Sequence, residues 1–135
     1  MRSGRSTLWT LAIALLFAGC GYDGPQMTVE QLEAALNDPS REITVIDVRS
    51  MELFRKGHVP GSINVPRGRI KVAEPELRDL EGEVAVICTC GRNSLAVCKQ
   101  LAEDGLKNVI LVTGGIQKWR EAGYPLETGP GVRKP

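Results

Sequence analysis

Residues 83–94 read Glu83-Val84-Ala85-Val86-Ile87-Cys88-Thr89-Cys90-Gly91-Arg92-Asn93-Ser94, and this segment carries the strongest signal for the fold. Its apolar run predicts a strand of a parallel sheet, buried on both faces. The run ends at Cys88, and a helical pattern begins near Ser94. A thiol at such a junction faces unpaired backbone N–H groups and the positive end of the helix dipole, which stabilise an anion. The segment therefore predicts that Cys88 is a reactive thiolate.

Strand and helix patterns alternate along the rest of the chain. Strands are expected at residues 43–46, 62–65, 84–87 and 108–112, and helices at 28–36, 51–56, 95–102 and 116–122. A further short helix is expected after Pro75, with the proline in its first turn. This alternation predicts an α/β fold of right-handed βαβ units, with helices on both faces of a parallel sheet.

The first twenty residues have the pattern of a secretory signal. Arg2 and Arg5 precede an apolar run, Leu8–Phe17, that is too short for a membrane span of about 20 residues. The ending Leu16–Cys20 resembles the lipobox of bacterial lipoproteins, which implies cleavage before Cys20 and lipidation of that residue. An ordinary signal peptide, cleaved near Gly19, is the alternative.

These features predict four segments: a lipoprotein signal peptide (1–19), a tether (20–26), one domain (27–128) and a C-terminal tail (129–135). Export would place the domain on the periplasmic side of the cell envelope, with a membrane contact through the lipid on Cys20. Gly21 stands where inner-membrane retention signals carry aspartate, which favours the outer membrane. Nothing in the sequence indicates more than a monomer.

Charge and cysteine content exclude other classes. The chain holds 17 Lys and Arg against 16 Asp and Glu, a net charge of +1. Without Arg2 and Arg5 the balance is 15 − 16 = −1, so there is no electrostatic case for nucleic-acid binding. The domain keeps three cysteines, Cys88, Cys90 and Cys98. An odd number of thiols outside the cytoplasm indicates reactivity rather than a disulfide framework.

The ordered motifs resemble those of single-domain rhodanese-like (thiosulfate sulfurtransferase) proteins over about residues 27–128. They are Asp47-Val48-Arg49, the segment Gly57-His58-Val59-Pro60-Gly61-Ser62-Ile63-Asn64-Val65-Pro66, Cys88-x-x-Gly91-x-x-Ser94, Thr113-Gly114-Gly115-x-x-x-Trp119, and Gly123-Tyr124-Pro125-Leu126-Glu127-Thr128. The resemblance implies a three-layer α/β/α fold with a five-stranded parallel sheet and the active cysteine after the fourth strand.

The resemblance also implies a reaction. Cys88 would attack the outer sulfur of a small anionic donor such as thiosulfate, carry a persulfide, and pass its sulfur to a thiophilic acceptor such as cyanide or a thiol. Loop residues Thr89, Cys90, Gly91, Arg92, Asn93 and Ser94 would bind the donor, and backbone N–H groups would stabilise the anionic sulfur. No metal or organic cofactor is required.

Two loop positions have open roles. Arg92 is expected to attract the anionic donor, or else to be a solvated residue of the first helical turn. Many family members carry arginine one position later, where this chain has Asn93. Asn93 is therefore expected to bind the donor or, alternatively, to cap the helix.

Other polar residues have structural interpretations. Cys90 could resolve the persulfide or form a disulfide with Cys88, but the short loop favours a spectator. Cys98 lies on the apolar stripe of its helix and is expected to be buried. Asp47 and Arg49 are expected to pair and hold loops together, and His58 is expected to stabilise its turn. Trp119 and Leu111 are expected in the core.

Three competing functions follow from the same residues. A rhodanese-fold phosphatase or arsenate reductase would carry arginine six positions after the cysteine, where this chain has Ser94. A thiol oxidoreductase would need a reversible Cys88–Cys90 disulfide. A non-catalytic binding module of this fold would usually lack the cysteine.

Overall fold

The computed structural model describes residues 21–131, so the predicted signal peptide and the predicted lipidation site at Cys20 lie outside the described residues. Within 21–131, none of the helices has the length and apolar character that crossing a bilayer would demand.

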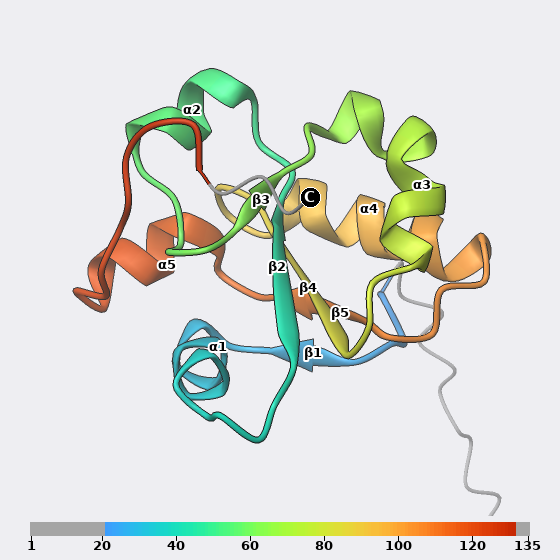
Figure 1. Cartoon of the computed structure of the whole chain (residues 1–135), viewed down its shortest axis with the longest axis horizontal. Helices are drawn as coiled ribbons and strands as arrows, with labels where there is room; N and C mark the ends of the chain where they lie inside the picture. Colours follow the sequence, from blue (N-terminus) through green and yellow to red (C-terminus); the bar gives the residue numbers. More distant parts are fainter. Residues whose placement is uncertain (1–20, 132–135) are drawn as a thin grey trace, which may run out of the picture.

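Five strands form one parallel sheet in the order β1-β5-β4-β2-β3 (Figure 1). The strands are β1 (Gln26–Met27), β2 (Ile43–Asp47), β3 (Ile63–Asn64), β4 (Glu83–Ile87) and β5 (Val109–Val112). The sheet confirms the predicted fold. β4, which carries the most apolar segment, lies at its centre, where both faces are covered.

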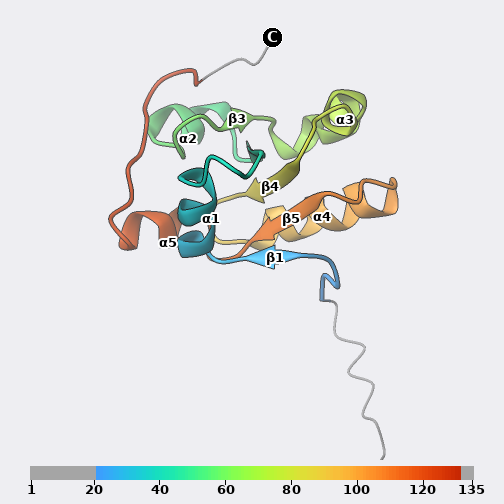
Figure 2. The same cartoon turned by 60° about the horizontal axis from the view of Figure 1, so that its bottom comes forward.

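Helices cover both faces of this sheet. They are α1 (Val29–Leu36), α2 (Met51–Lys56), α3 (Ile70–Arg78), α4 (Arg92–Glu103) and α5 (Gly115–Glu121), with a 3₁₀ turn, η1 (Arg67–Arg69), before α3. Figure 2 shows α1 and α5 lying together, with α4 on the other side of β5. The chain is thus a three-layer α/β/α domain.

Side chains of β4 divide between two apolar cores. Val84 and Val86 pack with α3 and α4, in a core that includes Leu77 and Leu101. Ala85 and Ile87 point the other way and pack with α1 and α5, in a core that includes Trp119. Successive strand residues alternate between faces, so a continuous apolar run supplies both cores at once. Trp119 and Leu111 are buried, as predicted.

The start of α3 differs from the sequence prediction. The helix begins at Ile70, and Pro75 is its sixth residue rather than a first-turn residue. Proline has no N–H, so the helix loses the bond that residue 75 would otherwise donate to the carbonyl of Lys71. Ile70 and Leu77 are buried on the core-facing side of α3, and their burial offsets that loss.

Residues 22–26, predicted as part of a tether, instead contact the domain. Tyr22 is buried, and its hydroxyl donates a 3.0 Å hydrogen bond to the carbonyl of Val109. The carbonyl of Pro25 accepts a bond from the N–H of Leu111, and Gln26 begins β1. These residues therefore pack on the domain. The C-terminal segment also returns to it, because the N–H of Gly129 donates to the carbonyl of Arg55.

Candidate active site

Cys88 lies at the carboxyl edge of the sheet, one residue beyond β4. β2 and β4 pair in register up to Asp47 and Ile87, and the N–H of Val48 then donates to the carbonyl of Ile87. The chain turns through Thr89–Gly91 and enters α4 at Arg92. Open parallel sheets bind their ligands beyond this edge. Cys88, the residue predicted to react, therefore lies where such folds have their binding sites.

Donors from the following loop surround the sulfur of Cys88. The backbone N–H of Gly91 donates to Sγ at 3.1 Å, and the Ser94 hydroxyl oxygen lies 3.4 Å from Sγ. The same hydroxyl lies 3.0 Å from the carbonyl oxygen of Gly91, to which it donates. Cys88 is only 2% exposed. A sulfur with this many donors and little water is suited to carrying negative charge.

Two opposing effects set the pKa of Cys88. Burial disfavours the thiolate and raises the pKa. Hydrogen bonds from the Ser94 hydroxyl and from the backbone N–H groups of Ser94, Gly91 and Cys90 favour the thiolate, and together they outweigh burial. The pKa of Cys88 is therefore lowered from its ordinary value. The direction of this shift is the one expected for a thiol at the strand–loop–helix junction.

The backbone of the Cys88 loop depends on two glycines. Gly91, the residue before α4, has φ +102°, a left-handed conformation that glycine adopts without strain. Gly115, at the start of α5, has φ +61°, and a Cβ there would lie 2.4 Å from the carbonyl oxygen of Cys88. The N–H groups of Ile116 and Gln117 donate to the carbonyls of Cys88 and Thr89. The start of α5 thus fixes the backbone of the loop through these two hydrogen bonds.

This support was not predicted from the sequence. In the sequence, Thr113-Gly114-Gly115 stands only as part of one of the five ordered motifs, although two adjacent glycines before a helix can signal a close approach of backbones. The partner of that approach, the Cys88 loop, lies more than twenty residues earlier in the chain. Only the pairing of β4 with β5 brings the two segments together.

The other predicted loop residues face outward. Thr89, Cys90, Arg92 and Asn93 are exposed, whereas Ser94 is buried against Cys88. Asn93 does not cap α4, because Gly91 occupies the cap position and Asn93 is the second residue of the helix. Its side-chain oxygen instead accepts a 3.0 Å hydrogen bond from Nη1 of Arg67, the first residue of η1. No sequence motif marks Arg67, so the sequence does not predict its place beside the loop.

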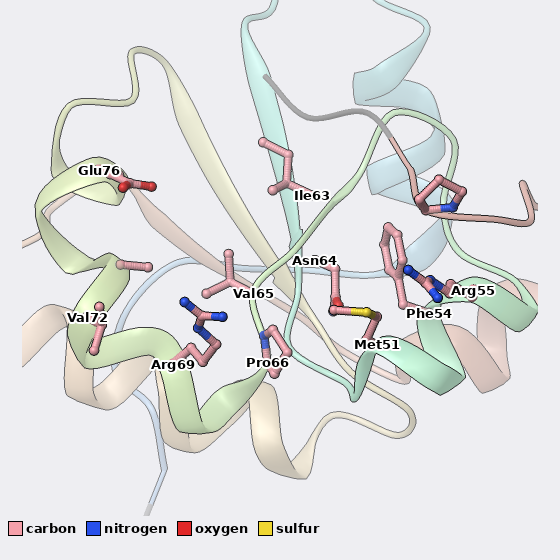
Figure 3. A pocket seen from close by; sticks show the side chains of 12 residues that line it. Met51, Phe54, Arg55, Ile63, Asn64, Val65, Pro66, Arg69, Val72 and Glu76 are labelled. Carbon is pink, nitrogen blue, oxygen red and sulfur yellow. The ribbon is translucent and has the colours of Figure 1, made fainter. Parts of the chain in front are cut away.

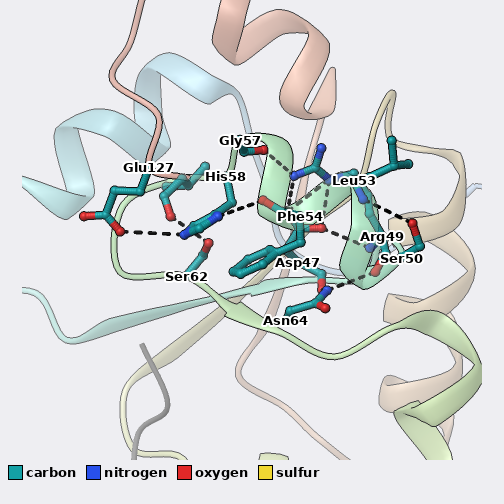
Figure 4. Close-up of polar contacts among 11 residues, drawn as sticks. Asp47, Arg49, Ser50, Leu53, Phe54, Gly57, His58, Ser62, Asn64 and Glu127 are labelled. Atoms are coloured by element: carbon teal, nitrogen blue, oxygen red, sulfur yellow. Dashed lines mark hydrogen bonds and ion pairs between the residues drawn. The ribbon is translucent and has the colours of Figure 1, made fainter. Parts of the chain in front are cut away.

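Asp47 and Arg49 form a buried ion pair, which Figure 4 draws with its neighbours. Nη2 of Arg49 lies 2.7 Å from Oδ2 of Asp47 and also donates to the carbonyl of Gly57 at 2.7 Å. The amide of Asn64 donates to the backbone carbonyls of both residues. The pair therefore ties the ends of β2 and β3 to the turn after α2, in agreement with the structural role predicted for it.

His58 belongs to the same framework and not to a cysteine–histidine dyad. Its ring stacks on Phe54 with centroids 3.7 Å apart, and Nδ1 lies 2.8 Å from the Phe54 carbonyl, to which it donates (Figure 4). Backbone bonds join His58 to Glu127 in both directions. Nε2 lies 3.7 Å from a carboxylate oxygen of Glu127, an ion-pair contact only when the ring is protonated. His58 thus fastens the C-terminal segment to α2.

The remaining cysteines differ sharply. Cys98 is fully buried, and burial raises its pKa to about 12, with a further contribution from Cys88. It therefore behaves as a small apolar side chain, as predicted. Cys90 is exposed, and all three cysteines of the described residues are free thiols.

A separate groove of about 460 Å³ lies between α2 and α3, over β3 (Figure 3). Met51, Phe54, Val65, Arg69 and Val72 are among its lining residues, and none of the residues 88–94 takes part. The groove is therefore distinct from the Cys88 loop.

The fold and this site define an α/β/α protein with a cysteine held by a backbone loop at the carboxyl edge of its sheet. The model of the family described as rhodanese-like domain matches residues 28–122, and the chain belongs to that family.

Several relatives carry a named activity. The chain is 33% identical over 89 residues to the thiosulfate sulfurtransferase GlpE of Actinobacillus succinogenes, covering 66% of this chain and 79% of the relative. It is 32% identical to GlpE of Pseudomonas syringae pv. syringae, covering 64% and 80%. The chain spans half or less of the length of four other curated relatives.

Solved structures agree with the fold. The crystal structure of a rhodanese-related protein from Thermoplasma volcanium superposes with a TM-score of 0.68 at 30% identity. The match covers 78% of this chain and 99% of that one.

Proposed function

We propose that this protein is a sulfurtransferase that carries sulfane sulfur as a persulfide on Cys88. The observation that carries the proposal is the cradle of the Cys88 sulfur, in which the Gly91 N–H and the Ser94 hydroxyl lower the pKa of a nearly buried thiol. Relatives named thiosulfate sulfurtransferase over most of their length support the same chemistry.

The first step transfers sulfur from an anionic donor. The Cys88 thiolate attacks the outer sulfur of thiosulfate, an S–S bond forms at Cys88, and the S–S bond of thiosulfate breaks to release sulfite. The charge is −3 on both sides, and no net oxidation occurs. The same donors that stabilise the thiolate would stabilise the terminal sulfur of the persulfide.

The second step returns the enzyme to its starting form. A thiophilic acceptor such as cyanide attacks the terminal sulfur, thiocyanate leaves, and the Cys88 thiolate is restored. Neither step needs a metal or an organic cofactor. Cys88 is only 2% exposed, so its sulfur is shielded from bulk solvent.

The test is formation of thiocyanate from thiosulfate and cyanide. Wild-type protein treated with thiosulfate alone should gain the mass of one sulfur atom on the peptide that contains Cys88. Cys88→Ser should lose both the adduct and the turnover, whereas Cys98→Ser leaves the reactive thiol in place and serves as the control. Unchanged turnover in Cys88→Ser would refute the proposal.

The requirement for Cys90 distinguishes a sulfurtransferase from a thiol oxidoreductase. An oxidoreductase that cycles through a Cys88–Cys90 disulfide needs both thiols, whereas persulfide transfer to an external acceptor needs only Cys88. We expect Cys90→Ser to keep its rate of thiocyanate formation. A loss of most of that rate would instead favour a resolving role for Cys90.

We also propose that the protein acts as a monomer on the periplasmic side of the envelope, anchored through lipid on Cys20 in the outer membrane. The basis is the lipobox-like end of the N-terminal apolar run. Cys20→Ala should move the protein from the detergent phase to the aqueous phase, and membrane fractionation would separate inner from outer membrane. A Cys20→Ala protein that stays with the membrane would contradict the anchor.

A further inference from the structure

A side chain from outside the Cys88 loop lies against its outer surface. Arg67 follows β3, and its backbone N–H donates a 3.0 Å hydrogen bond to the carbonyl of Val48, just beyond β2. Its guanidinium then donates to the side-chain oxygen of Asn93 at 3.0 Å. The first bond fixes the backbone of Arg67, and the second fixes its guanidinium group. The positive charge is therefore held beside the loop.

The charge of Arg67 is available for a ligand. Among residues 21–131, the ion pairs of the structure use other cations, and neither Arg67 nor the neighbouring Arg92 has a carboxylate partner among them. A guanidinium has five N–H donors, and the contact with Asn93 occupies only one. The remaining donors suit an oxyanion, which a planar guanidinium binds through two bonds at once.

We infer that Arg67 selects anionic reactants at Cys88 and that Asn93 is the residue that positions it. This inference rests on the proposed function, since it assigns the recognition of the donor's oxyanion end. The sulfur end of the donor meets Cys88, and the oxygens extend toward the exposed surface of the loop, where Arg67 lies. Arg67 thereby acts as a specificity residue without touching the sulfur.

The test compares two alkylating reagents that differ in charge. Iodoacetate is an anion and iodoacetamide is neutral, and both alkylate a thiolate with release of iodide. The ratio of their rate constants at Cys88, followed on the full chain by peptide mass spectrometry, reports the local field and does not require sulfur transfer. A change in thiolate fraction affects both reagents equally and cancels in the ratio.

Arg67→Gln should lower the iodoacetate-to-iodoacetamide ratio by about 3- to 10-fold, the effect expected for one partly screened charge near the reacting atom. Arg69→Gln is the matched control, because Arg69 is an exposed arginine of the same 3₁₀ turn that lines the groove in Figure 3. Its ratio should stay at the wild-type value. Arg67→Lys should keep part of the selectivity, because it keeps the charge but not the planar fork.

Asn93→Ala tests the positioning role. It preserves the charge of Arg67 but removes its anchor, so the ratio should fall less than in Arg67→Gln. A wild-type ratio in Asn93→Ala would overturn that role. If the ratio fell equally in Arg67→Gln and Arg69→Gln, a general surface field would explain it, and the assignment to Arg67 would be overturned. An unchanged ratio in both variants would also overturn the assignment.

These outcomes remain distinct from failure of the proposed function. If wild-type protein formed neither persulfide nor thiocyanate, the proposed function would fail, while the alkylation ratio would still measure anion selection by Arg67. If turnover occurred, the KM for thiosulfate should rise by about 3- to 10-fold in Arg67→Gln, as expected for the loss of one charge–ligand contact. The rate with saturating thiosulfate should change much less.

Discussion

The hydroxyl oxygen of Ser94 lies 3.4 Å from the sulfur of Cys88 and 3.0 Å from the carbonyl oxygen of Gly91. A hydroxyl has one proton to donate, so it can serve only one of these two acceptors at a time. When Cys88 is a thiol, the proton goes to Gly91 and the thiol can donate to Ser94. When Cys88 is a thiolate, rotation of the hydroxyl turns the proton to the sulfur. Ser94 therefore responds to the charge of Cys88.

Ser94→Ala should make Cys88 less reactive at neutral pH. Removing the hydroxyl withdraws a hydrogen bond from the thiolate, so the pKa of Cys88 moves up toward its ordinary value. Alkylation by iodoacetamide at pH 7 should slow by about 3- to 10-fold, the equivalent of one hydrogen bond of about 1 kcal/mol. The measurement is the alkylation rate at Cys88 across pH 5–10, where the wild-type profile should extend to lower pH than that of the variant.

Ser50→Ala is the control for this experiment. The Ser50 hydroxyl caps α2 by accepting from the N–H of Leu53, and it is not among the hydrogen bonds that set the pKa of Cys88. Its loss should cost about 1 kcal/mol of stability without changing the alkylation profile. Superimposable profiles for wild type and Ser94→Ala would contradict the role of Ser94.

Gly115→Ala should damage both stability and the Cys88 loop. Its Cβ would lie 2.4 Å from the carbonyl oxygen of Cys88, so the loop or the start of α5 must move. Gly123→Ala is the matched control, since Gly123 also has a positive φ, +77°, but a Cβ there meets nothing within 4 Å. Gly123→Ala should cost about 1 kcal/mol from backbone strain alone. Gly115→Ala should cost more than about 3 kcal/mol, because overpacking adds to that strain.

Urea unfolding measures the stability of both glycine variants. The rate of alkylation of Cys88 by iodoacetamide reports whether the loop is disturbed. We expect slower alkylation at Cys88 in Gly115→Ala and wild-type alkylation in Gly123→Ala. Equal stabilities of the two variants would mean that α5 does not hold the loop.

The buried pair of Asp47 and Arg49 should dominate the charge contributions to stability. Asp47→Asn keeps the size of the side chain but leaves a buried arginine without its carboxylate, which should cost about 3–5 kcal/mol. Arg41 and Glu83 form an exposed pair, with side chains 37% accessible on each side. Glu83→Gln should therefore cost less than about 1 kcal/mol. Chemical denaturation of both variants tests this, and similar losses would contradict the importance of burial.

Cys98 should make stability fall at high pH. Burial raises its pKa to about 12 from 9.0, so above pH 9 the unfolded chain releases this proton while the folded chain keeps it. The unfolding free energy then decreases as pH rises, by at most about 1.4 kcal/mol per pH unit, and Cys98 has no effect below pH 9. Cys98→Ala should show a shallower decline between pH 9 and 10.5 in urea unfolding. Parallel declines would mean that Cys98 titrates normally in the folded state.

The central elements of the fold could be predicted from local pattern. β4 is apolar throughout because it lies at the middle of the sheet, so its sequence alone indicates burial on both faces. β1 has only two residues and lies at an edge, so it has no periodicity to detect. The sequence predicts too short an α3, because Pro75 indicates a helix start, whereas burial of Ile70 and Leu77 extends the helix through the proline. Packing therefore overrides a local signal where enough apolar surface is buried.

The sequence by itself determined the parallel α/β class, the position of Cys88 at a strand–loop–helix junction, and the glycine and serine that complete its loop. These are contacts within seven residues, where chain geometry leaves few alternatives. The tertiary structure decided what surrounds that loop. The start of α5 contacts its inner side, the Asp47–Arg49 pair holds the neighbouring turns, and Arg67 brings a cation to Asn93. The contacts of α5 with the loop and of Arg67 with Asn93 join residues 26 or more apart in the chain, and only the order of strands in the sheet makes them neighbours.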